Sequence, residues 1–199
     1  MADLRFLRDV TEDEMVLAFV RAEVFSARFG ATFRRAMGGK QAVYNPDLSD
    51  HAANALRKQA LAAVRGYGQE AYLFRGWPQN VNWKLIAVTV EELGGFLYAN
   101  HPTWTTLTHD SRLVRDGAAN VETVPTHEDA KPNILAVERD VRSGQTYPPI
   151  IAAATDESSQ HVLIEGHTRA TAYVRALSPE DEIEVIVGYA PDVSGWLYY

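Results

Sequence analysis

A strand, a turn and a helix follow one another at residues 162–177, and this stretch constrains the fold more than any other. Val162, Leu163 and Ile164 form a short apolar run that is typical of a buried strand. A helical pattern then begins, with apolar residues at spacings of three, four and seven: Ala170, Tyr173, Val174 and Leu177. Residues 165–169, Glu-Gly-His-Thr-Arg, are therefore predicted to form the turn at the amino end of a helix.

This turn has the chemistry of an anion site, most often a phosphate site. A helix amino end exposes unpaired backbone N–H groups and a partial positive charge. Gly166 lets the backbone approach a ligand closely, and His167, Thr168 and Arg169 add donors. Structural roles stay open beside this one. Glu165 would then accept a hydrogen bond from a turn amide or cap the helix, Arg169 would pair with Glu165, Thr168 would be a plain helix cap, and His167 would make a structural hydrogen bond.

Composition excludes several classes of protein. The chain of 199 residues has no cysteine, which excludes a disulfide framework, a zinc thiolate site and a thiol nucleophile. No run approaches the roughly 20 apolar residues of a membrane span, and the first residues lack a signal-peptide pattern, so we expect a cytoplasmic protein without a membrane partner. The net charge of −7 argues against a broad basic surface for duplex nucleic acid, although it leaves a local basic groove open.

The chain is predicted to have two parts, a helical region at residues 1–78 and a mixed domain at 79–199. In the first part, an apolar face persists from Val16 to Phe33, and a second helix, capped by Ser49 or Asp47, stops near Gly66. The arginines here either contact an acidic or nucleic-acid partner or line solvated helix faces; they include Arg34, Arg57 and Arg65.

The second part alternates strands and helices. Strands are predicted at 83–88, 150–153, 161–165 and 183–187. Thr89 and Glu92 form a capping box that should begin a helix ending near Tyr98, and Asn133 should begin another that stops at Gly144. Residues 100–132 show little periodicity and are predicted to be irregular, which in a compact domain is more often functional or flexible than structural.

Residues 83–190 resemble the ParB/sulfiredoxin superfamily. The resemblance rests on a helix followed by Gly144 and a strand opened by Pro149-Ile150, on the turn at 164–169, and on a closing strand. The turn looks like the Gly-His-Arg or Gly-Glu-Arg-Arg turn of ParB proteins and the Asp-Gly-His-Thr-Arg turn of the ParB-like free serine kinases. The resemblance implies an α+β fold with a ParB/sulfiredoxin-like mixed sheet and flanking helices, behind a helical N-terminal region.

Members of this superfamily bind nucleotides at the turn, and several hydrolyse or transfer the terminal phosphate. By resemblance, the phosphate-binding role falls on Gly166, His167, Thr168 and Arg169, while Glu165 stands where the kinases have Asp and would bind a magnesium-bound water or a ribose hydroxyl. Other members are nucleases or DNA-binding proteins. The catalytic cysteine of sulfiredoxin is absent, which excludes repair of cysteine sulfinic acid, and the doubled arginine of the partition proteins is missing.

A second polar group lies in the irregular segment. By the same resemblance, Arg112 and Arg115 would clamp phosphates, and Asp110 or Asp116 would serve as a base or metal ligand. The alternative is a solvated polar loop. Trp104 either stacks on a base or packs in the core.

Three functions follow as hypotheses. The first is a Mg²⁺-dependent phosphohydrolase or phosphotransferase that acts on ATP or a related nucleotide, with a small hydroxyl-bearing acceptor in the case of transfer. The second is a ParB-like nuclease or DNA-binding factor, which the net charge disfavours and salt-sensitive binding would support. The third is a non-catalytic regulatory or interaction module, in which the aromatic tail Trp196–Tyr199 docks a partner or a second copy of the chain as a homodimer.

Overall fold

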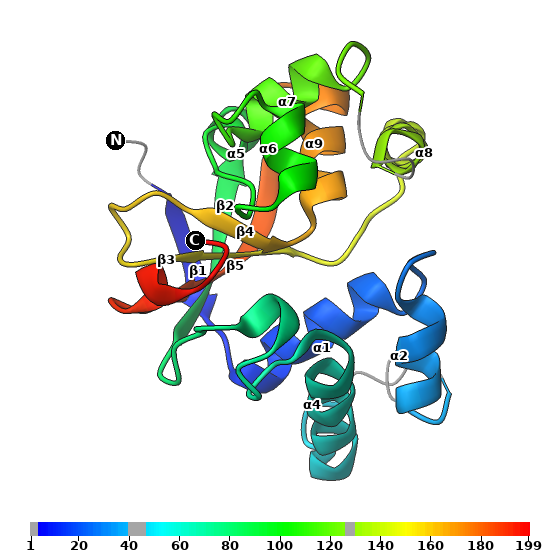
Figure 1. The fold of residues 1–199 in the computed structure, drawn as a ribbon, viewed down its shortest axis with the longest axis vertical. Coiled ribbons are helices and arrows are strands. Elements are labelled where there is room, and N and C mark those ends of the chain that lie inside the picture. The colour runs from blue at the N-terminus through cyan, green and yellow to red at the C-terminus, as the bar shows by residue number, and fades with distance from the viewer. Residues whose placement is uncertain (1–3, 40–46, 126–129) are drawn as a thin grey trace.

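The computed structural model describes residues 4–39, 47–125 and 130–199 of the chain. In these residues, five strands form one mixed sheet in the order β1-β2-β5-β3-β4 (Figure 1). The strands are β1 (Arg5–Asp9), β2 (Asn82–Thr89), β3 (Ile150–Ala154), β4 (Val162–Glu165) and β5 (Glu182–Tyr189). The fold is thus α+β with a mixed sheet, as the sequence predicts.

The middle strand of the sheet, β5, runs antiparallel to one of its neighbours and parallel to the other. It pairs antiparallel with β2 and parallel with β3, where Ile151 lies opposite Ile186. All five residues of β3 are buried, which matches its unbroken apolar sequence. The edge strand β4 pairs antiparallel with β3, and Ile151 lies opposite Glu165. This register places the turn after β4 beside the start of β3.

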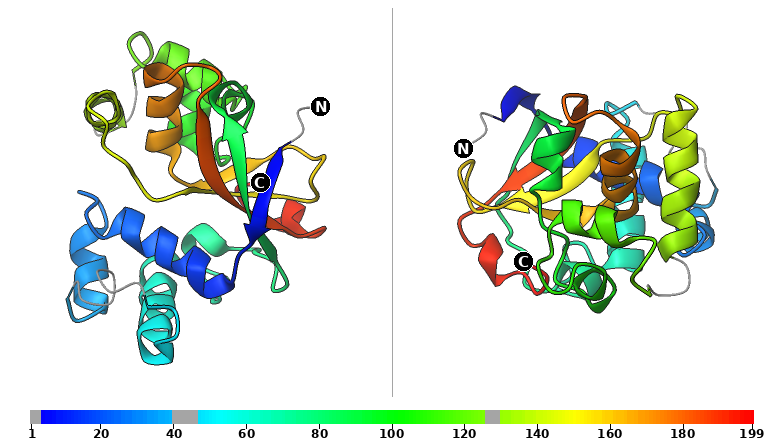
Figure 2. Two further views of the ribbon diagram at one scale, coloured as in Figure 1. Left: turned by 180° about the vertical axis from the view of Figure 1, so that it is seen from behind. Right: turned by 90° about the horizontal axis from the view of Figure 1, so that it is seen from above.

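Helices cover both faces of the sheet (Figures 1 and 2). One face carries the N-terminal helices α1 (Glu12–Glu23), α2 (Gly30–Ala36) and α4 (His51–Arg65). The other face carries α5 (Val90–Gly94), α6 (Pro102–Leu107), α7 (Val114–Asn120), α8 (Ala130–Arg142) and α9 (His167–Ala176). Two short 3-10 helices, at Tyr72–Phe74 and Val193–Gly195, complete the described elements.

Each face of the sheet has its own hydrophobic core. The core beneath the N-terminal helices joins Phe19 and Val24 of that layer to Ile151 and Ile164 of the sheet. The core on the other face joins Leu93 and Tyr98 to the alternate residues of the same strands, among them Leu163. Because β4 contributes to both cores, the residues at its carboxyl end lie at the junction between the two helical layers.

Several sequence predictions are confirmed. The four predicted strands are β2, β3, β4 and β5, and the helix after the turn is α9. The Thr89–Glu92 capping box is present, with the Glu92 carboxylate accepting the Thr89 amide proton at 2.7 Å. Gly66 ends α4 with a left-handed φ of +82°.

Other predictions are wrong. The segment 100–132 contains α6 and α7, the helix after Thr89 already ends at Gly94, and α4 is capped by Asp50. The apolar stretch 16–33 is divided between α1 and α2.

The N-terminal region also contains a strand, β1, which pairs with β2 and extends the sheet. β1 escaped prediction because its five residues are mostly exposed and carry no apolar alternation. Within the described part of the chain, we find no helix that is both long and apolar enough to cross a membrane.

Candidate functional site

The candidate site is the turn between β4 and α9. Gly166 adopts a left-handed φ of +94°, which reverses the chain into the helix. A Cβ atom at this position would lie 3.1 Å from Arg169 Nη2 and 3.1 Å from Ile150 Cγ1, so these two side chains would have to shift to admit a larger residue. No side chain among the described residues caps α9, and the first amides of a helix have no intrahelical acceptor, as an anion site requires.

Arg169 folds back on the protein instead of extending from the turn. Its guanidinium donates hydrogen bonds to the carbonyl of Pro148, to the carbonyl of Pro149 at 3.4 Å, and to the Glu165 carboxylate. The side chains of Arg169 and Glu165 are only 7% and 14% exposed. Arg169 therefore ties α9 to the start of β3, and it can hold a phosphate only by giving up these internal bonds.

Glu165 is a buried carboxylate at the junction of the layers. Burial raises its pKa to about 7, while the neighbouring Arg169 guanidinium acts in the opposite direction. The Gly166 amide also acts to lower the pKa of the Glu165 carboxyl. A carboxyl group with a pKa near neutrality can exchange a proton at physiological pH, which is a property of acid–base residues.

His167 lies in a stack of flat rings. Its ring is nearly parallel to that of Trp104, with centroids 5.0 Å apart, and Trp104 in turn stacks on Tyr98 at 4.8 Å. The Nε2 atom accepts a hydrogen bond from the Ala99 amide at 3.3 Å. Burial, followed by the charge of Arg65, lowers the pKa of His167 to about 3. His167 is therefore neutral at physiological pH and adds no positive charge to the turn.

Arg112 reaches the same region from the segment before α7. Its side chain lies within electrostatic range of His167, but its donors are used internally. They bind the carbonyls of Tyr98 at 2.9 Å, Tyr199 at 3.0 Å and Tyr198 at 3.3 Å. Arg112 thus holds the aromatic tail in place.

The other predicted residues of this segment are more dispersed. Asp110 and Arg115 are exposed, and the Asp116 carboxylate accepts a hydrogen bond from the Ser111 hydroxyl at 2.5 Å. Across residues 4–39, 47–125 and 130–199, no three histidine or acidic side chains gather as a metal-binding group. Glu165, Asp110 and Asp116 are accordingly not assembled into a Mg²⁺ site in this structure.

The structure adds two charged residues that the sequence analysis did not assign to the turn. Glu23, at the end of α1, and Arg65, at the end of α4, both lie within electrostatic range of Glu165. The signal for Glu23 was present in the sequence, because it falls four residues after Phe19 and three after Val20 on the apolar face of α1. Arg65 likewise follows the buried Leu61 by four residues.

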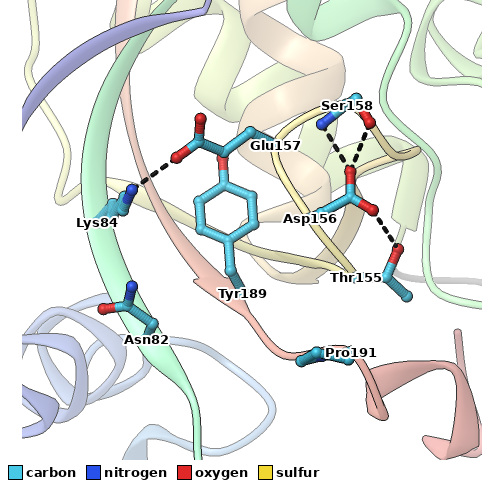
Figure 3. A pocket seen from close by; sticks show the side chains of 8 residues that line it. All are labelled: Asn82, Lys84, Thr155, Asp156, Glu157, Ser158, Tyr189 and Pro191. Carbon is cyan, nitrogen blue, oxygen red and sulfur yellow. Dashed lines mark hydrogen bonds and ion pairs between the residues drawn. The ribbon is translucent and has the colours of Figure 1, made fainter.

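A shallow hollow of about 610 Å³ lies at the opposite end of the β3–β4 hairpin (Figure 3). Its polar groups largely satisfy one another. Lys84 Nζ lies 2.6 Å from Glu157 Oε1, and Asp156 Oδ1 accepts hydrogen bonds from the Ser158 amide at 2.8 Å and hydroxyl at 2.6 Å. The turn at 165–169 remains the better candidate, because no side chain caps the amino end of α9 among the described residues.

No family model, curated protein or solved structure matches the chain. The function must therefore be inferred from the geometry of the turn. That geometry offers an uncapped helix amino end, a carboxyl group with a pKa near neutrality and the guanidinium of Arg65 within electrostatic range of both Glu165 and His167.

Proposed function

We propose that the protein binds a nucleotide or a similar phosphate-bearing molecule at the β4–α9 turn and acts on its terminal phosphate. One observation carries the proposal. The uncapped end of α9 lies near Arg65, whose Nε atom is buried without a hydrogen-bond partner among the described residues. Helix amides and a guanidinium fork together are the usual protein ligands of a phosphate group.

Each residue of the site would have a separate role. The amides of residues 167–169 and the Thr168 hydroxyl would hold the phosphate, and Arg65 would neutralise its charge. Arg169 would keep the turn in shape through Pro148, and Glu165 would take or give the proton of the nucleophile, since its pKa of about 7 suits that task. The described residues do not fit a resident Mg²⁺, so we derive no step through one; the cation would accompany the nucleotide phosphates.

The ParB/sulfiredoxin-like fold is part of the same proposal. Its support is that the turn motif, the glycine at 144 and the proline-opened strand fall in a strand–turn–helix and a helix–turn–strand of one mixed sheet. Gly144 follows α8 with a positive φ of +86°, as a glycine that ends a helix does.

A second candidate is a module that binds the ligand without reacting it. It is favoured by the internal bonds of Arg169 and Arg112, which leave both guanidinium groups engaged with backbone carbonyls. A phosphotransfer enzyme generally directs such groups at the transferred phosphate.

The test is thermal stabilisation by a panel of nucleoside triphosphates and diphosphates, each with and without Mg²⁺, together with an assay for released phosphate. A ligand that binds only the folded chain raises Tm. We expect the rise to disappear in Arg65→Gln and to persist in Arg139→Gln, a matched change at an exposed arginine of α8.

The outcomes separate the candidate functions. Stabilisation with phosphate release supports the enzyme, and stabilisation without release supports the binding module. The proposal is refuted if no nucleotide raises Tm, or if Arg65→Gln and the control respond alike; retention on DNA in that case would support a nucleic-acid function.

A further inference from the structure

A groove crosses the end of the sheet at which β2 begins and both β3 and β5 end. It consists of the hollow of about 610 Å³ in Figure 3 and a second hollow of about 550 Å³, and the two share Asn82, Tyr189 and Pro191. The strand register joins them, because Tyr189 lies opposite Asn82 of β2 on one side and Ala154 of β3 on the other. Ligands of open α/β sheets bind outside the carboxyl ends of the strands, and β3 and β5 are parallel neighbours that end at this groove.

The charged groups of this groove already have partners within the protein. Glu157 pairs with Lys84 at 2.6 Å, and Lys84 is the only lysine or arginine among the described residues that line the two hollows. Glu12, at the other end of the groove, pairs with Lys58 at 2.7 Å. The third carboxylate, Asp156, accepts hydrogen bonds from an amide and a hydroxyl of its own hairpin. An anionic ligand would therefore have to break the pair of Lys84, and a cationic ligand would have to compete with lysines already in place.

The groups that remain available for a ligand are uncharged. The side chains of Gln79, Asn80 and Asn82 are exposed, and their amides make no hydrogen bond with any residue that the structure describes. Each of these amides offers two donors and an acceptor oxygen. The half-buried ring of Tyr189 lies in the middle of the first hollow (Figure 3). Amides that both donate and accept suit hydroxyl groups, and an aromatic ring beside them suits the apolar C–H face of a sugar.

We infer that this groove binds a neutral oligosaccharide. The amides of Gln79, Asn80 and Asn82 hydrogen-bond the hydroxyl groups of the chain, and Tyr189 packs against the face of one sugar ring. A single small-molecule site occupies roughly 300–1,000 Å³, so two joined hollows of this size hold several linked sugars. The inference does not depend on the proposed function, because the groove lies at the end of the β3–β4 hairpin that is opposite the β4–α9 turn.

The experiment is titration calorimetry with four neutral oligosaccharides, namely maltohexaose, cellohexaose, xylohexaose and chitohexaose, and with oligolysine as a cationic comparison. We expect the wild type to bind at least one of the four, with the same Kd in about 50 mM and about 500 mM NaCl, because salt does not screen contacts to a neutral ligand. Gln79→Ala and Asn80→Ala should each weaken that ligand by roughly 2- to 10-fold, the range for one neutral hydrogen bond. Gln145→Ala, at an exposed glutamine after α8, is the matched control and should leave the Kd unchanged.

The Tm of each variant, which should match that of the wild type because the replaced side chains are exposed, shows that it is folded. The inference is overturned if none of the four oligosaccharides binds, or if Gln79→Ala and Asn80→Ala bind as tightly as Gln145→Ala. Binding of oligolysine alone, with an affinity that falls as salt rises, would overturn it in favour of a basic peptide. None of these outcomes alters the stabilisation by nucleotides expected at the β4–α9 turn.

Discussion

Replacing Arg169 should reveal how the turn is held, and the effect should depend on pH. In Arg169→Met, the carbonyls of Pro148 and Pro149 lose a charged donor, and Glu165 loses its neutralising neighbour. The first loss does not depend on pH and should cost roughly 2 kcal/mol of unfolding free energy, since a hydrogen bond to a charged group contributes roughly 1.5–3 kcal/mol.

The second loss grows as pH rises. Burial already raises the pKa of Glu165 to about 7 in the presence of Arg169, and without Arg169 the pKa should rise further. Above pH 7 the wild-type carboxylate is ionised in both the folded and unfolded states, whereas the variant must bind a proton to fold. Its stability should therefore fall by about 1.4 kcal/mol for each pH unit above 7, until the new pKa is reached. The total cost of Arg169→Met should approach about 5 kcal/mol at pH 9.

The assay is urea unfolding at pH 6, 7, 8 and 9 for the wild type, Arg169→Met and the double variant Glu165→Gln/Arg169→Met. The double variant should lack the pH-dependent part, because a glutamine has no charge to bury. Arg5→Met, which breaks the exposed pair of Arg5 with Glu182, should cost less than about 1 kcal/mol at every pH. A cost of Arg169→Met that stays constant from pH 6 to pH 9 would contradict the view that this arginine neutralises Glu165.

Three further predictions concern the same region and its surroundings. Because the folded-state pKa of Glu165 is raised from 4.5 to about 7, the protonated carboxyl contributes up to about 3 kcal/mol to the free energy of unfolding below pH 4.5, and this contribution is lost as pH rises to 7. In Glu165→Gln, urea unfolding should show that the fall in stability between pH 4.5 and pH 7 has vanished. Burial lowers the pKa of His161 from 6.5 to about 4. The neutral imidazole therefore contributes about 3 kcal/mol to the free energy of unfolding above pH 6.5, and this contribution is lost as pH falls to 4. His161→Phe should remove this loss of stability in acid. Gly166→Ala should cost clearly more than Gly144→Ala, as measured by Tm, because both have a positive φ but only the Cβ at 166 would meet neighbouring atoms within 4 Å.

Local pattern was enough to predict the strands and the helix of the candidate turn. Strands β2, β3 and β5 have apolar runs bounded by turn residues, and α9 has a clear helical period. The short helices α6 and α7 have too few residues for such a period. Tertiary contacts stabilise them, such as the stack of Trp104 on Tyr98. No local rule can supply that contact, and the segment therefore looked irregular.

The same limit applies to the candidate site. The five residues of the turn are adjacent in sequence and could be recognised together. The partners that decide their roles are distant: Pro148 lies 21 residues before Arg169, and Arg112 binds the carbonyl of Tyr199, 87 residues away. Glu23 and Arg65 come within electrostatic range of Glu165 because α4 packs on α1, and α1 shares a hydrophobic core with Ile164 of the sheet.

These distant partners change where the positive charge of the site must come from. Within the turn, His167 is neutral and Arg169 is bound to Glu165 and to a backbone carbonyl, so the turn itself supplies the helix amides and little net charge. An anion bound there would depend on Arg65, which belongs to the other helical layer. The affinity of the site should then follow the packing between the layers. A change in that packing far from the turn, such as Phe19→Ala in the shared core, should weaken a bound phosphate ester along with the fold.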